Sequence, residues 1–241
     1  MRKAIIFAIF ITAAFGQSCD IVMHDTVRGN GSLSTDTRNI PQVSRIKSQG
    51  NFDIDIVLGG SPSLKIEADA NLIPYILTSN EDGKLVIHTK DHVDLSSDNK
   101  IKVTITTDKV EELEINGNGN ITSSSKITGG DHLKLGIYGN GDITLDVNSP
   151  KVESTIAGNG NINLTGETKD SKIEIDGNGD YKAEGLLAEN AEVHINGSGG
   201  ARLACSVSLD VRIAGSGDVF YKDTPSIHQT VIGSGNIKQI Q

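Results

Sequence analysis

The chain has 241 residues, which is enough for one large β domain or two small ones. Its 31 acidic residues outnumber its 22 basic residues and give a net charge of −9, which argues against nucleic-acid binding because that function needs a basic face. A hydrophobic content of 36% argues against a disordered chain.

Residues 1–18 are predicted to be a signal peptide. Arg2 and Lys3 form its charged start, and the apolar run at 4–15 is too short to span a bilayer. No later apolar run approaches spanning length, so we expect the mature chain to be exported rather than integral to the membrane. The expected location is the outer membrane or the cell surface, with a periplasmic or secreted protein as the alternative.

Two cleavage sites fit this segment. Small residues before Gln17 suit a general signal peptidase, which would leave Gln17 at the new N-terminus. The sequence GQSC at 16–19 resembles a lipobox, although Gly16 stands where that pattern usually has Leu, Val or Ile. We favour lipidation of Cys19 and assign 19–27 to an anchor or spacer.

A G-[NS]-G triplet recurs along the chain. Copies begin at 29, 117, 139, 158, 177, 197, 215 and 233, and the intervals from 117 onward are 18–22 residues. Apolar residues alternate on both sides of a triplet without a change of phase, as at Ile137 before one copy and Ile143 after it. This alternation predicts two strands for each repeat, with both glycines facing inward and the central Asn or Ser facing outward.

The glycines are predicted to be structural corners. An inward-facing pair without side chains leaves room for a sharp bend, and glycine also permits a positive φ. The predicted corner residues are Gly117, Gly119, Gly139, Gly141, Gly158, Gly160, Gly177, Gly179, Gly197, Gly199, Gly215, Gly217, Gly233 and Gly235.

The period of 18–22 residues fits one coil of a right-handed parallel β-helix, an all-β solenoid in which each coil pairs with the coils above and below it. A left-handed β-helix needs an aliphatic residue every six positions, and this pattern fails after Ile143. Antiparallel hairpins with Asn-Gly turns remain the alternative. We assign 111–241 to regular coils, and 28–110, where loops are longer, to irregular β coils or a β cap on the solenoid.

Several segments in order carry a family resemblance. They are GNGSLSTDTRNI (29–40), GNFDIDIVLG (50–59), SLKIEADANLIPYI (63–76), DGKLVIHTK (82–90), KIKVTITTDKVEELEINGNGNI (100–121) and the later triplets. Over 28–241 the chain resembles the GIN family of auto-transporter adhesin head domains, which is common in exported proteins of the Bacteroidetes. The resemblance implies a β-helical fold, a cell-envelope location and an adhesin-like role.

A set of Asn and Asp residues follows the second glycines and should form a column when coils stack. Its members are Asn120, Asp142, Asn161, Asp180, Asp218 and Asn236. Gly/Asp turns of nonapeptide β-rolls bind calcium, but that motif has a shorter period and more Asp than this repeat. We favour a ladder of side chains that bond to backbone amides.

We expect the remaining His, Arg and Cys candidates to lie on the surface or in the core without forming a site. The segment HTKDHVD, with His88, Asp91, His92 and Asp94, lies at a strand end rather than on a helix, so we expect no metal site. We expect His132 and His194 to be solvated. Arg202 and Arg212, near Asp210 and Asp218, are interpreted as surface charge pairs rather than as part of a polysaccharide lyase site. Cys205 is predicted to be a small buried hydrophobe.

We therefore expect a non-enzymatic cell-envelope protein that presents a β-helical binding or adhesion surface and needs no cofactor. The alternative is a glycan-binding or glycan-cleaving module, although only 4% aromatic residues are present to stack on sugars. The expected partner is an envelope protein or a glycan, with membrane contact only through the lipid anchor. We also expect the coil at 231–241 to be covered, as in a weak homo-oligomer.

Overall fold

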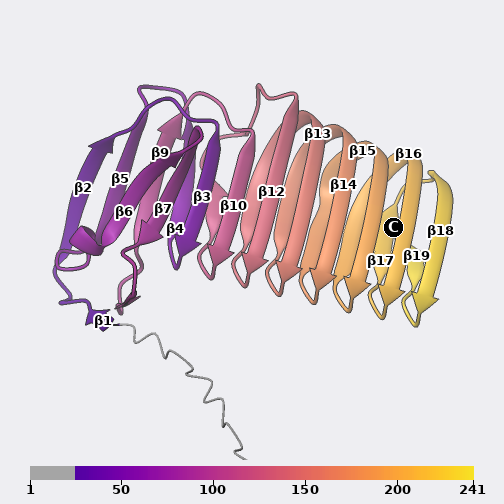
Figure 1. Ribbon diagram of the computed structural model, residues 1–241. Helices are drawn as coiled ribbons and strands as arrows, with labels where there is room; N and C mark the ends of the chain where they lie inside the picture. Colours follow the sequence, from indigo (N-terminus) through magenta and orange to yellow (C-terminus); the bar gives the residue numbers. More distant parts are fainter. Residues whose placement is uncertain (1–24) are drawn as a thin grey trace, which may run out of the picture.

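The computed structural model describes residues 25–241, which form a long stack of β-strands (Figure 1). The predicted signal peptide and Cys19 lie outside the described residues. The elements are β1 (Asp25–Arg28), β2 (Leu33–Asn39), β3 (Arg45–Gly50), β4 (Asp53–Leu58), β5 (Ser63–Asp69), the 3-10 turn η1 (Ile73–Tyr75), β6 (Ile76–Glu81), β7 (Lys84–Thr89), β8 (Val93–Ser96), β9 (Lys102–Thr107), β10 (Glu112–Gly117), β11 (Ile121–Ser123), β12 (His132–Gly139), β13 (Ile143–Gly158), β14 (Ile162–Gly177), β15 (Asp180–Gly197), β16 (Gly200–Gly215), β17 (Val219–Lys222), β18 (Ser226–Gly233) and β19 (Ile237–Gln239).

The stack is the all-β solenoid that the repeat predicts. Equivalent strands of successive regular coils pair in parallel and in register, which excludes the series of antiparallel hairpins. Each long strand bends midway and contributes to both faces of the solenoid, as β13 does with Ile143–Ser149 on one face and Lys151–Gly158 on the other.

Two faces run along the stack. Face A contains the strands that end at the first glycine of a corner, namely β3, β10, β12, the second halves of β13 to β16, and β18. β7 and β6 extend this ladder beyond β3. Face B contains the strands that follow the corner in the regular coils and the strands that extend their ladder, namely β2, β5, β9, β4, β11, the first halves of β13 to β16, β17 and β19. β1 and β8 form a separate parallel pair.

The N-terminal strands do not stack in chain order. β3 lies between β7 and β10 on face A, and β4 lies between β9 and β11 on face B, so β3 and β4 form a coil between segments that follow them in the sequence. Beyond β7 and β9 the pairing becomes antiparallel, through β6 on face A and through β5 and β2 on face B. The N-terminal part thus combines parallel pairing next to the regular coils with antiparallel pairing at its outer end.

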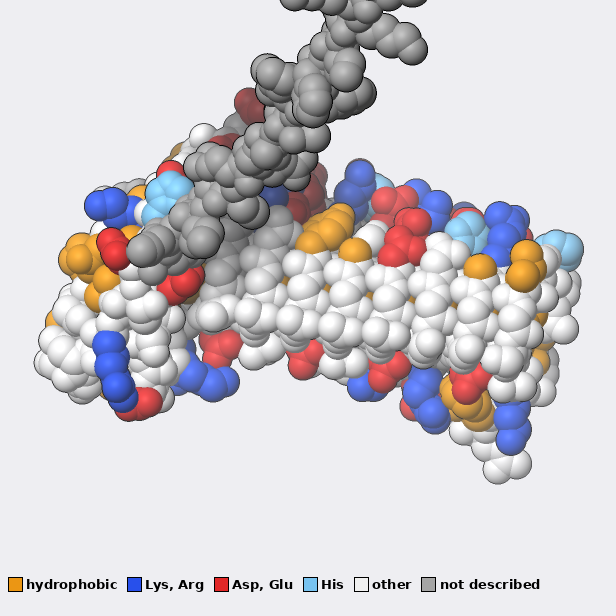
Figure 2. Space-filling model, turned by 60° about the horizontal axis from the view of Figure 1, so that its bottom comes forward, with side chains coloured by type: hydrophobic (Ala, Val, Ile, Leu, Met, Phe, Trp, Pro, Cys, Tyr) orange, Lys and Arg blue, Asp and Glu red, His pale blue; other side chains and the backbone are white. Residues whose placement is uncertain are grey.

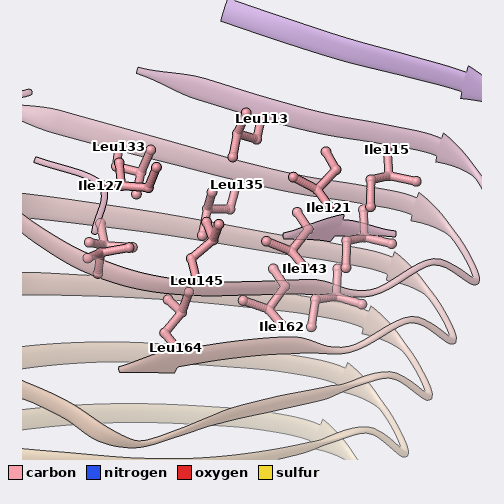
Figure 3. Packing of buried hydrophobic residues seen from close by; sticks show 14 of the residues in the cluster. Leu113, Ile115, Ile121, Ile127, Leu133, Leu135, Ile143, Leu145, Ile162 and Leu164 are labelled. Carbon is pink, nitrogen blue, oxygen red and sulfur yellow. The ribbon is translucent and has the colours of Figure 1, made fainter. Parts of the chain in front are cut away.

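The core consists of aliphatic columns that register brings together. Ile121, Ile143 and Ile162 align on face B, and Leu113 and Leu135 align on face A (Figure 3). All five are at most 2% exposed. Burying one such side chain stabilises the fold by about 1.5–3 kcal/mol.

Among the regular coils, Tyr181 is a fully buried aromatic side chain in this largely aliphatic interior. Tyr181 continues the column of Ile162, and its neighbour in the next coil is the small Ala201. Its hydroxyl lies 3.2 Å from the buried Ser171 Oγ on the opposite face. Burial raises the pKa of Tyr181 to about 12, despite the hydrogen bond with Ser171 that lowers it. The small residues around the ring compensate for its volume, which preserves core packing.

The corner glycines lie where the backbones of successive coils approach most closely. The first glycine of each corner has a φ of +133° to +158°. A Cβ there would lie 2.0–2.4 Å from the carbonyl oxygen of the equivalent Gly in the preceding coil. At the second glycine the corresponding distance is 1.9–2.3 Å. The repeat predicts that the missing side chains leave room inside the bend, whereas the atoms closest to an added Cβ belong to the backbone of the neighbouring coil.

We expect Gly179→Ala to lower the free energy of unfolding by about 2–4 kcal/mol, because its Cβ would lie 2.1 Å from Gly160 O and the stacked backbone cannot yield. Gly179 has no positive φ, so this change isolates the close approach. Gly129→Ala is the matched control, because it has a φ of +84° and open space, and its cost should be about 1 kcal/mol. Urea unfolding measures both variants, and equal losses would contradict a close-packed corner.

Candidate functional site

The corner edge carries a ladder of exposed side-chain amides. Asn118 Nδ2 donates to Asn51 Oδ1 at 2.9 Å, and Asn140 Nδ2 donates to Asn118 Oδ1 at 2.8 Å. Asn159 and Asn178 continue the ladder in the same direction, at 2.8 and 3.1 Å. Serines take the central position in the last three copies. Figure 2 shows this edge as an uncharged band with charged side chains gathered along both of its sides.

The first member of the amide ladder, Asn51, belongs to a corner without a G-[NS]-G triplet. Gly50 pairs in register with Gly117, and the backbone of Phe52 stands where later corners have the second glycine. Gly29-Asn30-Gly31, by contrast, is not a stacked corner. The backbone N–H of Asn30 donates to Asn71 Oδ1, and Asn30 Oδ1 accepts from the backbone N–H of Ser32, in a local turn.

The predicted column after the second glycine is a ladder that bonds to backbone amides. Asp142 Oδ1 accepts from the backbone N–H of Asn161 at 2.8 Å. Asp180 Oδ1 accepts from the backbone N–H of Gly200 at 3.1 Å, and Asp218 Oδ1 from that of Asn236 at 2.9 Å. The column begins at Asp53, whose Oδ1 accepts from Asn120 Nδ2. The neutral residues Asn120, Asn161 and Gly200 separate the carboxylates along the column. These bonds confirm the ladder that the sequence favours over a calcium site.

Face A carries a column of charged side chains that sequence analysis missed. Its members lie five residues before the first glycine of each repeat and pair in register. We call this the charge column, and it consists of Glu112, Lys134, Glu153, Lys172, Glu192, Asp210 and His228. The constant offset of five residues is the sequence signal that would have found it. The signs alternate through the first five members, which places attractive neighbours about 4.8 Å apart.

The charge column ends in a cluster of half-buried ion pairs near β3 and β7. Lys84 Nζ lies 2.7 Å from Glu112 Oε1 and 3.0 Å from Glu114 Oε2. Lys47 Nζ lies 2.9 Å from Glu114 Oε1. Burial alone would raise the pKa of Glu114, but the hydrogen bonds from Lys47 and Lys84 outweigh it and lower the pKa below its usual value. This cluster therefore favours the ionised carboxylate.

A shallow groove of about 950 Å³ lies on face A over the last coils. Charged residues of both signs line it, including Lys151, Glu153, Lys172, Asp210 and Arg212. Lys151 Nζ lies 2.6 Å from Glu153 Oε1, and this hydrogen bond raises the pKa of Lys151 and lowers that of Glu153. The groove is a polar surface whose charges are held in pairs.

The two histidines predicted to be solvated lie beside the same groups. His132 Nε2 is 3.1 Å from Glu153 Oε2, and His194 Nε2 is 3.1 Å from Glu192 Oε1. Both rings are half-buried rather than fully solvated. They lie on the outward side of face A, as the alternation predicts, but each faces a carboxylate in addition to water.

The two arginines of the charge-pair prediction lie in one coil but on different faces. Arg212 lies on face A, with Nη2 3.3 Å from Asp210 Oδ2. Arg202 lies on face B, with Nε 2.7 Å from Glu184 Oε1 and its guanidinium over the ring of Phe220. Both are surface charge pairs, although Arg202 pairs with Glu184 rather than with Asp218. The structure does not bring the two arginines together.

The segment at 88–94 lines a second surface hollow of about 530 Å³ beside Asn51 and Phe52. His88 Nδ1 lies 3.1 Å from the carbonyl oxygen of Thr89. Within residues 25–241 no three His, Cys, Asp or Glu side chains are placed to hold a metal ion together.

Cys205 is fully buried, as the sequence predicts. Its thiol donates to the carbonyl oxygens of Glu189 and Ser208, and burial raises its pKa despite hydrogen bonds from nearby backbone. None of the helical structure in the described part of the chain is long and apolar enough to cross a membrane.

Comparison with known proteins identifies relatives of the whole solenoid. The family model "Putative auto-transporter adhesin, head GIN domain" matches residues 43–225. A putative adhesin of Bacteroides fragilis is 22% identical, with a TM-score of 0.83, and the match covers 89% of this chain and all of that one. A putative adhesin of Parabacteroides merdae is 26% identical, with a TM-score of 0.72 over 90% of this chain and all of that one.

A third solved structure carries a different description. A putative lipid binding protein of Parabacteroides distasonis is 24% identical, with a TM-score of 0.75, and the match covers 90% of this chain and all of that one. The comparison with curated proteins gives no match.

The ion-pair cluster predicts a pH dependence of stability. The pKa of Glu114 is lowered in the folded state, so its stabilising effect is present above the unfolded pKa of about 4.3 and is lost as the pH falls through the lower folded pKa. We expect Glu114→Gln to cost about 1 kcal/mol at pH 7 and to lose less stability than wild type between pH 5 and pH 3.

Glu67→Gln is the control, because the Lys65–Glu67 pair has the same type of ion pair at 3.0 Å but both side chains are 44% exposed. Thermal unfolding at a series of pH values measures the effect. The same pH profile for both variants would contradict a special role for the cluster at Glu114.

Proposed function

The chain belongs to the putative auto-transporter adhesin, head GIN domain family, and on this premise we propose that it is a non-enzymatic cell-envelope protein that binds its partner through face A. The observation that carries the proposal is the open groove on face A, lined by charges of both signs. The paired strands beneath it form a rigid support, so the groups that contact a partner are ordered before binding.

The charges in the groove suit recognition better than catalysis. A general acid or base needs a pKa near the working pH. Lys151 and Glu153 hold each other charged, because their hydrogen bond moves the pKa of the amine upward and that of the carboxylate downward. Such pairs give electrostatic complementarity to a partner surface that also carries both signs. We therefore favour a protein partner.

A glycan-binding module is the second candidate. One side of the groove offers neutral hydrogen-bonding groups in successive coils, namely Asn190, Ser208 and Ser226. No Phe, Tyr or Trp is among the residues that line the groove, which removes the stacking contacts that sugar-binding sites commonly use. A glycan-cleaving activity receives less support, because the charged pairs lack the shifted acid that cleavage needs.

The anchoring part of the proposal rests on the sequence. The apolar segment at 4–15 followed by Ser18-Cys19 supports export and lipid attachment at Cys19. A lipid at this position would place the solenoid at the outer membrane or cell surface, with the stack held away from the bilayer by the region at 19–27.

Binding to arrays of envelope proteins, host proteins and glycans tests the role of face A. We expect Lys172→Gln combined with Arg212→Gln to weaken binding to the recognised array members at least tenfold, because both changes remove charge from the groove. Lys65→Gln combined with Lys102→Gln is the control on face B and should stay within twofold of wild type. Equal loss in both double variants would exclude face A as the binding surface, and binding to glycans alone would favour the second candidate.

Metabolic labelling with palmitate in the native host tests the anchor. We expect label on the wild-type chain and none on Cys19→Ser, which should also leave the membrane fraction because it loses its acyl chains. Cys205→Ser is the matched control and should keep the label, since the thiol of Cys205 is buried in the solenoid. A mature wild-type chain that begins at Gln17 without label would overturn the lipoprotein assignment.

A further inference from the structure

One position in the column after the second glycines has no side chain. Gly200 lies between Asp180 and Asp218, whereas Asn or Asp occupies this position after every other corner triplet from 117 onward. Gly200 has no positive φ, so its backbone does not require glycine. A Cβ there would lie 3.1 Å from Asp180 Oδ1 and 3.6 Å from the carbonyl oxygen of Asp218, much farther than at the corner glycines. The missing side chain therefore leaves a gap between two carboxylates instead of relieving a backbone contact.

The gap is part of a hollow of about 270 Å³ between the corner edge and face B. Besides the three residues of the column, Ser198, Ser216, Arg202 and Phe220 line it. The guanidinium carbon of Arg202 lies 5.0 Å from the centre of the Phe220 ring. The strand that carries Phe220, β17, pairs with β16 on one side and β19 on the other, so the hollow lies within the stack. It combines carboxylates, hydroxyls, a guanidinium and an aromatic ring, and it is separate from the groove on face A.

The charged groups of the hollow are largely compensated. Arg202 Nε lies 2.7 Å from Glu184 Oε1, and Lys182 Nζ lies 3.4 Å from Asp180 Oδ2. Asp218 Oδ1 accepts hydrogen bonds from the next coil, whereas Asp218 Oδ2 has no hydrogen-bond or ion-pair partner within residues 25–241. A strongly charged ligand of either sign would meet a like charge, because an anion would face the carboxylates and a cation would face the guanidinium. The lining therefore favours a neutral ligand that both donates and accepts hydrogen bonds.

We propose that this hollow binds one neutral sugar ring. Sugar hydroxyls can donate to the carboxylate oxygens of Asp180 and Asp218, and they can accept from the N–H groups of Arg202 that Glu184 does not use. The C–H groups of the sugar ring pack against Phe220, which supplies the aromatic contact that the groove on face A lacks. The volume lies just below the range of about 300–1,000 Å³ for drug-sized ligands, which restricts the occupant to a single ring. A protein on face A and a sugar in this hollow would not compete.

Filling the gap tests the site without removing any group that contacts the ligand. Gly200→Asn gives the column the residue type that Asn120, Asn161 and Asn236 already provide, so the variant should fold and its side chain should occupy the hollow. We expect saturation-transfer NMR on the full chain to detect binding of at least one of glucose, galactose, mannose, fucose and N-acetylglucosamine, in the millimolar range for one small ring. Gly200→Asn should weaken this binding at least tenfold, because it takes up the space of the ring.

Gly136→Asn is the matched control on face A and should bind the sugar within twofold of wild type. Gly136 also lacks a positive φ, and the atom nearest to an added Cβ is Tyr138 Cε2 at 3.0 Å, the end of a side chain that can move. Circular dichroism checks that each variant is folded.

Phe220→Thr is the second variant, and it removes the ring while keeping a residue type that stands at the equivalent positions Thr122 and Thr144. We expect it to weaken sugar binding at least tenfold. Lys172→Gln combined with Arg212→Gln should bind the sugar as wild type does, so the outcome for this hollow is independent of the outcome for face A. A wild-type chain that binds none of the five neutral sugars, binding of only glucosamine or calcium ions, or unchanged binding in either Gly200→Asn or Phe220→Thr would overturn the proposal.

Discussion

The approach of one corner backbone to the next is the constraint on which the solenoid depends. At each corner from Gly117 onward a Cβ would lie within 2.4 Å of a carbonyl oxygen in the preceding coil, so only glycine fits both positions there. The same contact sets the register, because each first glycine pairs with the first glycine of its neighbour. Once this register is fixed, every other position in the repeat stacks on its equivalent, inside and outside.

Stacking places equivalent residues of successive coils next to one another in columns, and this proximity restricts which charges can be neighbours in a column. Like charges at about 4.8 Å repel each other on an exposed sheet. Neutral residues therefore separate the carboxylates after the second glycine, and Glu alternates with Lys through most of the charge column. Glu192 and Asp210 are neighbours that break the alternation. Arg212 Nη2 lies 3.3 Å from Asp210 Oδ2, and His194 Nε2 lies 3.1 Å from Glu192 Oε1.

The sequence carried the information for the regular coils because each repeat is local. Alternation gave the inward positions, and the triplet spacing predicted the column of Asn and Asp residues after the second glycines, although not the charge column. The order of the N-terminal coils was not accessible in this way, because β3 and β4 stack between strands that follow them in the chain, and strand neighbours are chosen by edge pairing rather than by chain order.

The corner at 50–52 lacks the triplet for a physical reason. Glycine is needed at the second position of a corner when the neighbouring coil of the stack also has a tight corner at that place. The coil that stacks next to Phe52 on the N-terminal side connects β7 to β9 through a wide loop instead of a tight corner. A large buried side chain therefore fits at position 52. The triplet at 29–31 shows the opposite case: the triplet is present, but its flanking strands do not stack with the corners of the solenoid. Flanking register, and not the triplet alone, therefore defines a corner.

The separation of scaffold and surface explains how such a fold can serve binding. Inward residues and corners are fixed by packing, whereas the outward residues of face A meet only other outward side chains, in the same column or in the adjacent one. Charges can therefore change along face A as long as opposite signs remain adjacent, and the backbone that presents them does not move. In the groove this rule leaves Lys151, Glu153 and Lys172 ordered by mutual attraction and open to a partner. A partner with complementary charges then replaces solvent at groups that are already in position, which limits the entropy lost on binding.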